Sequence, residues 1–383
     1  MNKISIGIYD HAFHFAGGGQ RYVAKMAESI QERYDITYIS NKASNLNNYK
    51  KWFNIDLSGC QLKTIKLPYY EILRRYFVDE GAVILPFYNP FKRISEESLK
   101  YQIFINVNML TKVKPLSPVS IFFCHFPDRQ KSKYFFYVDK YTFLVSNGLY
   151  SSFWIKKRWG LEPTHIIYPP VDMYNKASSI EGKENIILSV ARFEIGGSKK
   201  QIEMVKAFEN LIKIRPDLRE TWRLILAGGS FPSNPYLKKV KDYVNTLQLN
   251  NIEIKPDLSF EELSYLYAKS AIFWHACGLN ETNPHLVEHF GMTTVEAMQN
   301  YVVPVVIDGG GQKEIVEHNK SGFRFNTLDE LVSYTLELIH NEKLRKEMAI
   351  NAYKRSHLFN ADVFKEKIDK LFDEVEKKLK KNI

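Results

Sequence analysis

Short runs of β-branched and aromatic residues alternate with amphipathic runs along the whole chain, and this alternation limits the fold more than any other feature. KISIGIY and DITYIS (residues 3–9 and 35–40) have the pattern of buried strands, and a glycine-led helical run lies between them. The same order returns from residue 185, where NIILSVARF, KKQIEMVKAFENLIKI and WRLILAGG follow one another. Strand, helix and strand in succession predict a parallel sheet covered by helices. We therefore predict a doubly wound α/β fold in both halves.

The chain of 383 residues is longer than one hydrophobic core usually supports, which predicts two domains. Periodicity is lost at residues 166–185, where Pro, Ser and Gly collect, so we place the linker there. We predict a first domain at 1–174 and a second at 175–360. Residues 361–383 have apolar side chains at helical spacing and predict one long helix that can pack back on the first domain. Open α/β sheets bind ligands outside the carboxyl ends of their strands, which predicts a cleft between the domains.

The basic residues are concentrated in the first half of the chain. Residues 1–175 contain 23 Lys and Arg against 14 Asp and Glu, and the remainder contains 30 against 29. Such an excess of cations indicates a phosphate-bearing partner or an anionic membrane surface. A basic surface that only keeps the protein in solution explains the excess equally well. The basic, aromatic segments at 69–93 and 128–143 favour an acceptor presented at a membrane, although such aromatic runs are more often core.

Three cysteines, Cys60, Cys124 and Cys277, are far apart in the sequence and odd in number. This pattern indicates neither a disulfide framework nor a zinc site, and it favours a reducing compartment. The N-terminus alternates like a strand and lacks a signal-peptide pattern, and no run of about 18 apolar residues occurs. We expect a cytoplasmic protein, at most peripheral to the cytoplasmic face of a membrane, with no nucleic-acid partner.

Two loops have the composition of anion sites. Gly17, Gly18 and Gly19 lie between the first strand and the first helical run, where backbone N–H groups and a helix dipole can approach a phosphate. This loop lacks the lysine of a P-loop and does not match G-x-G-x-x-G, so a plain tight turn is the alternative. In the second half, Arg192 follows a strand and Lys199 opens the next helix, so both can face a diphosphate at the carboxyl edge. A solvated helix face is the alternative for the lysine.

Two glutamates in HLVEHFGMTTVEAMQN, Glu288 and Glu296, first suggest a hydrolase. Geometry argues against that function, because residues eight apart on one helix lie about 12 Å apart along its axis and are rotated by about 80°. The paired carboxyl groups of glycosidases lie about 5 to 9.5 Å apart. We predict instead that a helix begins near Gly291, with Glu288 in the preceding loop and Glu296 two turns in. The N–H groups of residues 290–292 then point into the cleft.

This stretch resembles the E-x7-E motif of the retaining glycosyltransferases of family 4. Other segments match that family in order along nearly the whole chain: GGGQRYVAKMAESI, HFP at 125–127, VSNGLYSSFWIKKRWG, YPPVD, ARF, KKQIEMVKAF, LILAGG and VVPVVIDGGGQKEIVEHNKSGF. No single segment is specific, but a collinear series of this length is hard to obtain by chance. The resemblance implies the GT-B fold, in which two Rossmann-like domains face each other across a cleft.

The resemblance implies a donor site in the second domain. Arg192 and Lys199 would hold the diphosphate of a nucleotide-sugar. Glu288 would lie beside the donor sugar, and Glu296 would accept hydrogen bonds from the ribose hydroxyls. The backbone N–H groups near the sugar would be those of Phe290, Gly291 and Met292.

In the first domain, the resemblance implies that Gly18 and Gly19 approach the diphosphate and that His125 lies near the transferred sugar and the acceptor. The position of His125 at the end of a strand supports this role, and a core histidine with satisfied hydrogen bonds is the alternative. His275 stays unassigned. The catalytic set that the resemblance implies is His125, Glu288, Arg192 and Lys199.

The implied reaction is transfer of a sugar from a nucleotide diphosphate to a hydroxyl with retention of the anomeric configuration. Cations stabilise the charge that builds on the leaving diphosphate. Because Arg192, Lys199 and helix N-termini supply this positive charge, the resemblance implies no metal and no cofactor beyond the nucleotide-sugar. Glu288 would then position the sugar and stabilise charge, without a covalent enzyme intermediate.

Two positions depart from the family pattern. Asn300 stands where the family usually has glycine after the acidic helix, and we interpret it as a C-cap, because asparagine accepts the left-handed conformation. Residues 195–197 (IGG) lengthen the loop before the diphosphate lysine. This leaves two candidates, of which Lys199 is preferred over Lys200 because Phe208 follows it at the family's usual distance.

Donor and acceptor are suggested by three segments. WHACGLNETNPHLVEHFG, HFP and YPPVD are most similar to mannosyltransferases that extend lipid-linked oligosaccharides and to related prokaryotic glycan-assembly enzymes. This favours GDP-mannose as donor and a glycan or lipid-linked glycan as acceptor. A UDP-sugar donor, carrying glucose or N-acetylglucosamine, is the alternative within the same fold. Two further alternatives are a phosphorylase-like transfer, against which the lack of a cofactor-lysine motif argues, and a non-catalytic nucleotide-sugar-binding module, which the retained donor residues disfavour.

Overall fold

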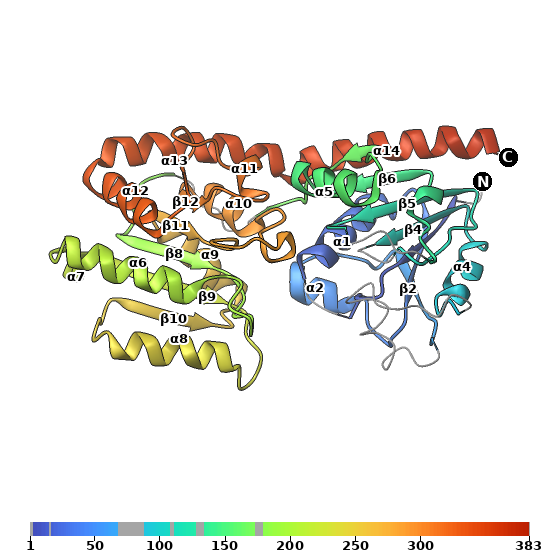
Figure 1. Cartoon of the computed structure of the whole chain (residues 1–383). Helices are drawn as coiled ribbons and strands as arrows, with labels where there is room; N and C mark the ends of the chain where they lie inside the picture. Colours follow the sequence, from blue (N-terminus) through green and yellow to red (C-terminus); the bar gives the residue numbers. More distant parts are fainter. Residues whose placement is uncertain are drawn as a thin grey trace. The chain divides into compact units, whose positions relative to one another are not determined.

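The computed structural model describes residues 3–14, 17–67, 88–107, 111–127, 134–172 and 179–382. The chain divides into two compact units: unit 1 comprises Met1–Pro170 and Ala361–Ile383, and unit 2 comprises Val171–Asn360. Each unit is built around one parallel sheet (Figure 1). The predicted α/β fold with two Rossmann-like sheets and a long C-terminal helix is confirmed.

Unit 1 has one seven-stranded sheet, whose strands are β1 (Ser5–Tyr9), β2 (Asp35–Ser40), β3 (Cys60–Thr64), β4 (Ile103–Val107), β5 (Val119–Cys124), β6 (Phe143–Ser146) and β7 (His165–Ile166). The strand order is β3-β2-β1-β4-β5-β6-β7, so the order reverses between β1 and β4. The helices of this unit are α1 (Gly18–Ile30), α2 (Asn47–Phe53), α4 (Lys92–Ser98), the 3₁₀ turn η1 (Val138–Lys140), α5 (Leu149–Trp159) and α14 (Ala361–Asn382).

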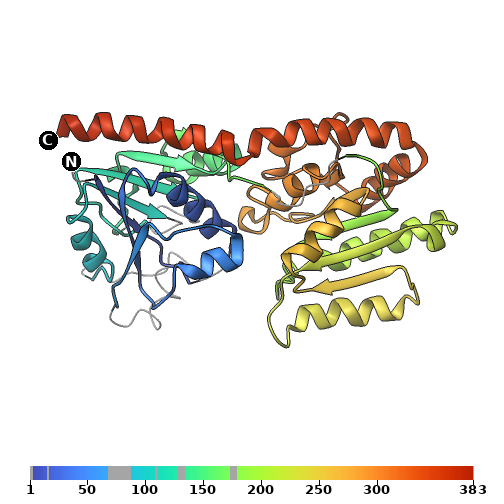
Figure 2. The ribbon, with the colours of Figure 1, turned by 180° about the vertical axis from the view of Figure 1, so that it is seen from behind.

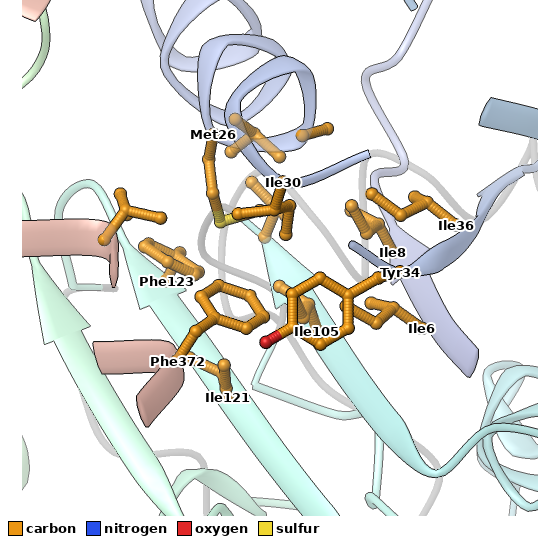
Figure 3. Packing of buried hydrophobic residues seen from close by; sticks show 14 of the residues in the cluster. Ile6, Ile8, Met26, Ile30, Tyr34, Ile36, Ile105, Ile121, Phe123 and Phe372 are labelled. Carbon is orange, nitrogen blue, oxygen red and sulfur yellow. The ribbon is translucent and has the colours of Figure 1, made fainter. Parts of the chain in front are cut away.

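Alternate strand residues of unit 1 point to opposite faces of the sheet, and helices cover both faces, so both are buried. Ile6 and Ile8 of β1 belong to the core that α1, α2 and α14 cover, and α4 and α5 cover the other face. Figure 3 shows part of this first core, to which Met26 of α1, Ile121 of β5 and Phe372 of α14 all contribute side chains.

The C-terminal helix α14 belongs to the core of unit 1, although it is the last element of the chain. Its apolar residues at 364, 368, 371, 372 and 375 are all buried in that core. Arg33 Nη1 donates to Asp369 Oδ1 at 2.9 Å, and the Tyr34 hydroxyl donates to Glu376 Oε1 at 2.5 Å. Both views show this helix, drawn in red, lying along unit 1 (Figures 1 and 2). Burial of one apolar stripe explains its length and amphipathic pattern.

Unit 2 has one six-stranded sheet, whose strands are β8 (Ile186–Val190), β9 (Arg223–Gly228), β10 (Ile252–Pro256), β11 (Ile272–His275), β12 (Val303–Ile307) and β13 (Phe323–Phe325). The strand order is β10-β9-β8-β11-β12-β13. Its helices are α6 (Gln201–Ile214), α7 (Leu218–Thr221), α8 (Pro235–Thr246), α9 (Phe260–Lys269), η2 (Pro284–Leu286), α10 (Met292–Met298), α11 (Gln312–Ile315), α12 (Leu328–His340), α13 (Glu342–Ser356) and η3 (His357–Phe359).

The sheet of unit 2 also separates two cores. Ile187 of β8 packs with α6, α8, α12 and α13, whereas Ile186 and Leu188 pack with α9 and α10. Burial on both faces explains why these strands appear in the sequence as continuous apolar runs. The polar loops beyond the strand ends are therefore the parts of this unit that are free to bind ligands.

Two predicted helix starts are wrong. Gly18 and Gly19 are the first residues of α1 and not part of the loop before it; Gly17 is the N-cap. Lys199 does not open α6, which begins at Gln201, because the N-cap Lys200 has a φ of 60° and cannot belong to a right-handed helix.

The predicted role of Asn300 is also wrong. The C-cap of α10 is Gln299, which is right-handed, and the residue with positive φ after this helix is Tyr301, at 56°. Asn300 is buried, and its Nδ2 donates to Glu296 O at 2.9 Å. The asparagine thus stabilises the last turn of α10 through its side chain and not through a left-handed backbone.

The segments predicted to face a membrane are only partly described. Of the ranges 69–93 and 128–143, residues 69–87 and 128–133 lie outside the described part of the chain, and so do residues 173–178 of the predicted linker. Among the helices that the structure describes, none is both long enough and apolar enough to cross a bilayer.

Candidate functional site

β8 and β11 lie side by side at the centre of the unit 2 sheet, with β9 and β10 beyond β8 and with β12 and β13 beyond β11. Ile272 of β11 pairs with Ile187 of β8 on one side and with Val303 of β12 on the other. The strand order reverses between β8 and β11, and open parallel sheets bind ligands outside the carboxyl ends of the strands at this switch point. The loops that follow these two strands, 191–200 and 276–291, therefore mark the candidate site.

Glu288 joins the two loops. Lys199 Nζ donates to Glu288 Oε2 at 2.9 Å, and His275 Nε2 lies 3.2 Å from the same oxygen. His275 is the last residue of β11 and is 3% exposed. A second ion pair, between Lys200 Nζ and Glu281 Oε1 at 2.6 Å, also links the loops. Of the two lysines that the sequence offers for a diphosphate, Lys199 is the one that contacts Glu288.

The pair formed by Lys199 and Glu288 is ionised at neutral pH. Burial raises the pKa of the Glu288 carboxyl, but the Lys199 ammonium and the hydrogen bond from His275 outweigh burial and hold this pKa well below its ordinary value. Burial lowers the pKa of Lys199, yet the negative charge of Glu288 raises it above its ordinary value overall. Burial raises the pKa of Cys277 to about 12, so this neighbouring thiol stays protonated. The site thus presents a fixed carboxylate and a fixed ammonium to a ligand.

The glycine loop after β12 (residues 309–311) supports the backbone of the acidic loop, which is the part of loop 276–291 that carries Glu288. Gly311 N donates to Glu288 O at 2.9 Å. Gly310 has a φ of 56°, and a Cβ there would lie 2.1 Å from Glu288 O. A Cβ on Gly311 would lie 2.4 Å from Phe290 Cα, whereas a Cβ on Gly309 would meet nothing closer than 3.9 Å. Only the last two glycines are therefore required for the close approach of the two loops.

Gly291 is the N-cap of α10, with a φ of 114°, so the helix starts where the sequence predicts. Glu288 lies in the preceding loop, and Glu296 is the fifth residue of the helix, in its second turn. Glu296 is buried, and its Oε2 accepts a hydrogen bond from the Tyr267 hydroxyl at 3.0 Å. The two glutamates of the motif thus have different surroundings, since one contacts an ammonium and an imidazole and the other a hydroxyl.

Arg192 lies two residues after the end of β8, and its ion pair is with Glu194 and not with Glu288. Its side chain is 71% exposed, and Nη2 donates to Glu194 Oε1 at 2.8 Å. The backbone before it is fixed by the neighbouring strand, because Gly228 at the end of β9 approaches so closely that a Cβ there would lie 2.0 Å from Ala191 O. Arg192 thus combines an anchored backbone with an open guanidinium.

The residues predicted for the first domain lie in unit 1. Gly18 and Gly19 lead α1, in the connection that follows β1. His125 follows β5, its ring packs edge-on against Tyr22 with the centroids 5.4 Å apart, and its carbonyl accepts a hydrogen bond from Ser151 Oγ at 2.7 Å. Both segments lie beyond the carboxyl ends of strands, where sheets of this class bind ligands.

The unit 2 site offers cationic side chains as well as carboxylates to a ligand. Arg192 and Lys199 are suited to an anionic group, because a guanidinium fork and an ammonium both bind phosphate oxygens. In the part of the chain that the structure describes, no three or more His, Cys, Asp and Glu side chains gather as a metal site would require. The arrangement therefore fits a diphosphate-bearing ligand.

Two residues that contact the acidic motif, His275 and Tyr267, were not assigned from the sequence. They lie 13 and 29 positions from the glutamates that they contact. No helix or strand periodicity links residues at such separations. One signal for His275 was present, because it ends the apolar run AIFWH and strand ends line ligand sites in this fold class. Tyr267 lies inside α9 and carries no comparable signal.

Comparison with known proteins adds a family match to this geometry. Residues 172–355, which are nearly all of unit 2, match the family model described as Glycosyl transferases group 1. The sequence is 25% identical to a GDP-Man:Man(3)GlcNAc(2)-PP-Dol alpha-1,2-mannosyltransferase of Dictyostelium discoideum, over 95% of this chain and 83% of that protein. It is 24% identical to the alpha-1,3/1,6-mannosyltransferase ALG2 of Rhizomucor pusillus, over 80% of this chain and 77% of that protein.

A solved structure has a similar fold over nearly the whole chain. Anabaena Alr3699/HepE in complex with UDP-glucose superposes with a TM-score of 0.69, covering 97% of this chain and 100% of that chain at 14% identity. At this low identity the similarity shows the fold alone.

Proposed function

Because the chain belongs to the group 1 glycosyltransferases and has their GT-B fold, it transfers a sugar from a nucleotide-sugar, and we propose that the sugar is mannose and the donor GDP-mannose. Members of this retaining family work without a metal ion. We propose further that the acceptor is a hydroxyl of a glycan carried on a lipid diphosphate. These two assignments are supported by the relatives, since both are mannosyltransferases and one is named for GDP-Man and a PP-Dol-linked glycan.

The observation that carries the proposal is the contact between Lys199 and Glu288 beyond β8 and β11. A leaving nucleoside diphosphate gains negative charge as the glycosidic bond breaks, and a cation already in place stabilises that charge. We assign Lys199 to this role, together with Arg192. Glu288 Oε2 is held by Lys199 and His275, whereas Oε1 accepts no hydrogen bond within the described residues. We assign Oε1 to a hydroxyl of the donor sugar.

The remaining predicted residues are proposed to complete the site. Glu296 accepts hydrogen bonds from the ribose hydroxyls, and Tyr267 fixes its carboxylate. His125 lies near the transferred sugar and the acceptor hydroxyl. The proposed backbone contacts with the sugar and the diphosphate are those of Phe290, Gly291, Met292, Gly18 and Gly19.

Donor choice is tested by thermal shift and by transfer to a short-chain lipid diphosphate glycan. A ligand at 100 times its Kd stabilises a protein by about 2.7 kcal/mol, so GDP-mannose is expected to raise Tm by several degrees. Mannose transfer from GDP-mannose is expected to be at least about tenfold faster than transfer from UDP-glucose or UDP-N-acetylglucosamine. Faster transfer from either UDP-sugar would favour the alternative donor. If nucleotide-sugars stabilised the protein but no sugar were transferred, the alternative of a non-catalytic nucleotide-sugar-binding module would be favoured.

Helix α5 of unit 1 has two large apolar side chains on its surface beside cations. Leu149 and Phe153, which are one turn apart, are 55% and 57% exposed. Lys157 Nζ lies 5.7 Å from the centre of the Phe153 ring, and Lys156 and Arg158 share the last turn. Exposed apolar groups beside cations are typical of a helix that lies on an anionic lipid surface. We propose that this face contacts the cytoplasmic side of a membrane, where a lipid-linked acceptor is presented.

Vesicle sedimentation tests this contact. The double variant Leu149→Gln and Phe153→Gln is expected to bind phosphatidylglycerol vesicles at least about tenfold more weakly, because each large side chain that leaves water contributes about 1.5–3 kcal/mol. The control is Ile214→Gln, since Ile214 is 52% exposed and follows Lys213 at the end of α6. Equal binding by the double variant and the wild type would contradict the proposed contact.

A further inference from the structure

Lys199, His275 and Glu288 form one cluster around Glu288 Oε2. Of these three residues, His275 alone lies on a strand. It ends β11, pairs with Val306 of β12 in the sheet, and is 3% exposed. Glu288 and Lys199 belong to the loops 276–291 and 191–200, which can shift without breaking the sheet. A group on a rigid element fixes a position more accurately than a group on a loop. The imidazole is thus the fixed point of this cluster.

The surroundings of the two ring nitrogens decide which of them carries the proton. Its Nε2 lies 3.2 Å from Glu288 Oε2, and an ionised carboxylate can only accept a hydrogen bond, so the proton must be on Nε2. Its Nδ1 is buried and makes no hydrogen bond within the described part of the chain, so a proton on Nδ1 would face no acceptor. The ring therefore donates in one direction, toward the carboxylate.

Two donors hold one oxygen and leave the other open. Lys199 Nζ and His275 Nε2 both point at Oε2, and rotation about the last bond of Glu288 would cost both contacts. We propose that His275 is a positioning residue that locks the Glu288 carboxylate so that Oε1 faces the donor sugar. This inference rests on the proposed function, because it takes Glu288 to be the residue that contacts the sugar.

Other titratable groups also act on Glu288. Glu288 interacts electrostatically with Cys277 and His289, which lie in the same loop. Glu194 interacts electrostatically with Lys199, the ion-pair partner of Glu288. Burial lowers the pKa of His289 to about 4, so that ring is neutral near pH 7, as is the Cys277 thiol. Neither His289 nor Cys277 therefore changes its charge near neutral pH.

Two variants separate positioning from simple packing. His275→Leu fills the space without a donor and is expected to lower kcat/KM for the nucleotide-sugar about 10- to 100-fold, the value of a hydrogen bond to a charged group. It should also move the acidic limb of the pH profile to higher pH, because the Glu288 pKa rises when a donor is lost. His275→Gln, whose amide nitrogen can take the place of Nε2, is expected to recover activity to within about fivefold of wild type and to keep the original acidic limb. The Kd of GDP alone should change less than about threefold in both variants.

The inference is overturned if His275→Leu keeps the kcat/KM and pH profile of the wild type, or if His275→Gln is as impaired as His275→Leu. A second measurement does not depend on sugar transfer. Urea unfolding of wild type, His275→Leu, Glu288→Gln and the double variant is expected to give non-additive shifts of the midpoint, because the two side chains contact each other. Additive shifts would overturn the contact. A wild-type protein that transferred no sugar would contradict the proposed function, whereas the unfolding cycle would still decide the role of His275.

Discussion

Replacing Lys199 by methionine is expected to lower kcat/KM for the nucleotide-sugar about 10²- to 10³-fold, with most of the loss in kcat. One donor aimed at developing charge contributes about 2.7–4 kcal/mol to the stabilisation of a transition state. Lys199 Nζ is also the closer of the two groups at Glu288 Oε2, at 2.9 Å, so its removal frees the carboxylate as well. Steady-state kinetics with GDP-mannose measure the effect.

Lys200→Met is the matched control for this prediction. Lys200 is the neighbouring residue and forms a similarly buried ion pair, with Glu281 at 2.6 Å. The kcat/KM of Lys200→Met is expected to fall less than about tenfold, because the partner of Lys200 is not the motif glutamate. If kcat/KM fell strongly in Lys200→Met and only slightly in Lys199→Met, Lys200 and not Lys199 would be the residue that binds the diphosphate. In the double variant Lys199→Met and Glu288→Gln, the losses should be less than multiplicative, since the two side chains act on each other.

The ion pair also predicts a pH dependence of stability. The pKa of Glu288 is depressed in the folded protein, so its ionised form stabilises the fold above the ordinary pKa of glutamate, and this contribution is lost as the pH falls. Lys199→Met brings the pKa of Glu288 back toward its ordinary value. The wild type is therefore expected to have a larger free energy of unfolding than the variant at pH 7. This difference should shrink below about pH 4.

Gly310→Ala is expected to reduce kcat/KM more than about 10²-fold and to lower Tm by several degrees. Gly310 has a φ of 56°, which costs a residue with a Cβ about 1–2 kcal/mol. The added carbon would also lie 2.1 Å from Glu288 O, so the acidic loop must move to admit it. A displacement of about 1 Å at a reacting centre can cost about 10²-fold in rate. Kinetics and thermal unfolding together measure both effects.

Gly309→Ala is the control within the same loop. The nearest atom to a Cβ on Gly309 lies at 3.9 Å, and its φ is not in the left-handed region. Activity and Tm are expected to stay near the wild-type values. If both alanine variants behaved alike, the glycine loop would have no specific role in seating Glu288.

Helices and strands were largely predictable because their signals are local. The spacing of eight residues between Glu288 and Glu296, with Gly291 between them, was enough to place one glutamate in a loop and the other on a helix, as the structure has them. The errors are also local, at single residues with unusual backbone. Lys200 at a φ of 60° delays the start of α6, and Tyr301 takes the left-handed conformation that was assigned to Asn300. A residue with a side chain gives little warning that it will adopt positive φ.

The candidate site was predictable only in part, for a different reason. Lys199 and Glu288 were both named from motifs, but their contact spans 89 positions, and the contact of His275 with Glu288 joins a strand end to a loop. The glycine run after β12 was noted only as part of a family-like segment. Its support of the Glu288 backbone depends on the close approach of this run to the loop 276–291, which the sequence does not reveal.

The sequence by itself therefore determined the α/β class, the succession of strands and helices, and the residue types available for a diphosphate and a sugar. These properties follow from periodicities of two and about 3.6 residues, which are short-range. Tertiary structure alone decided that His275 and Lys199 share one oxygen of Glu288 and that Gly310 and Gly311 support its backbone. The physical reason is the strand order, which brings β8, β11 and β12 together, so that the loops after them meet at one edge of the sheet.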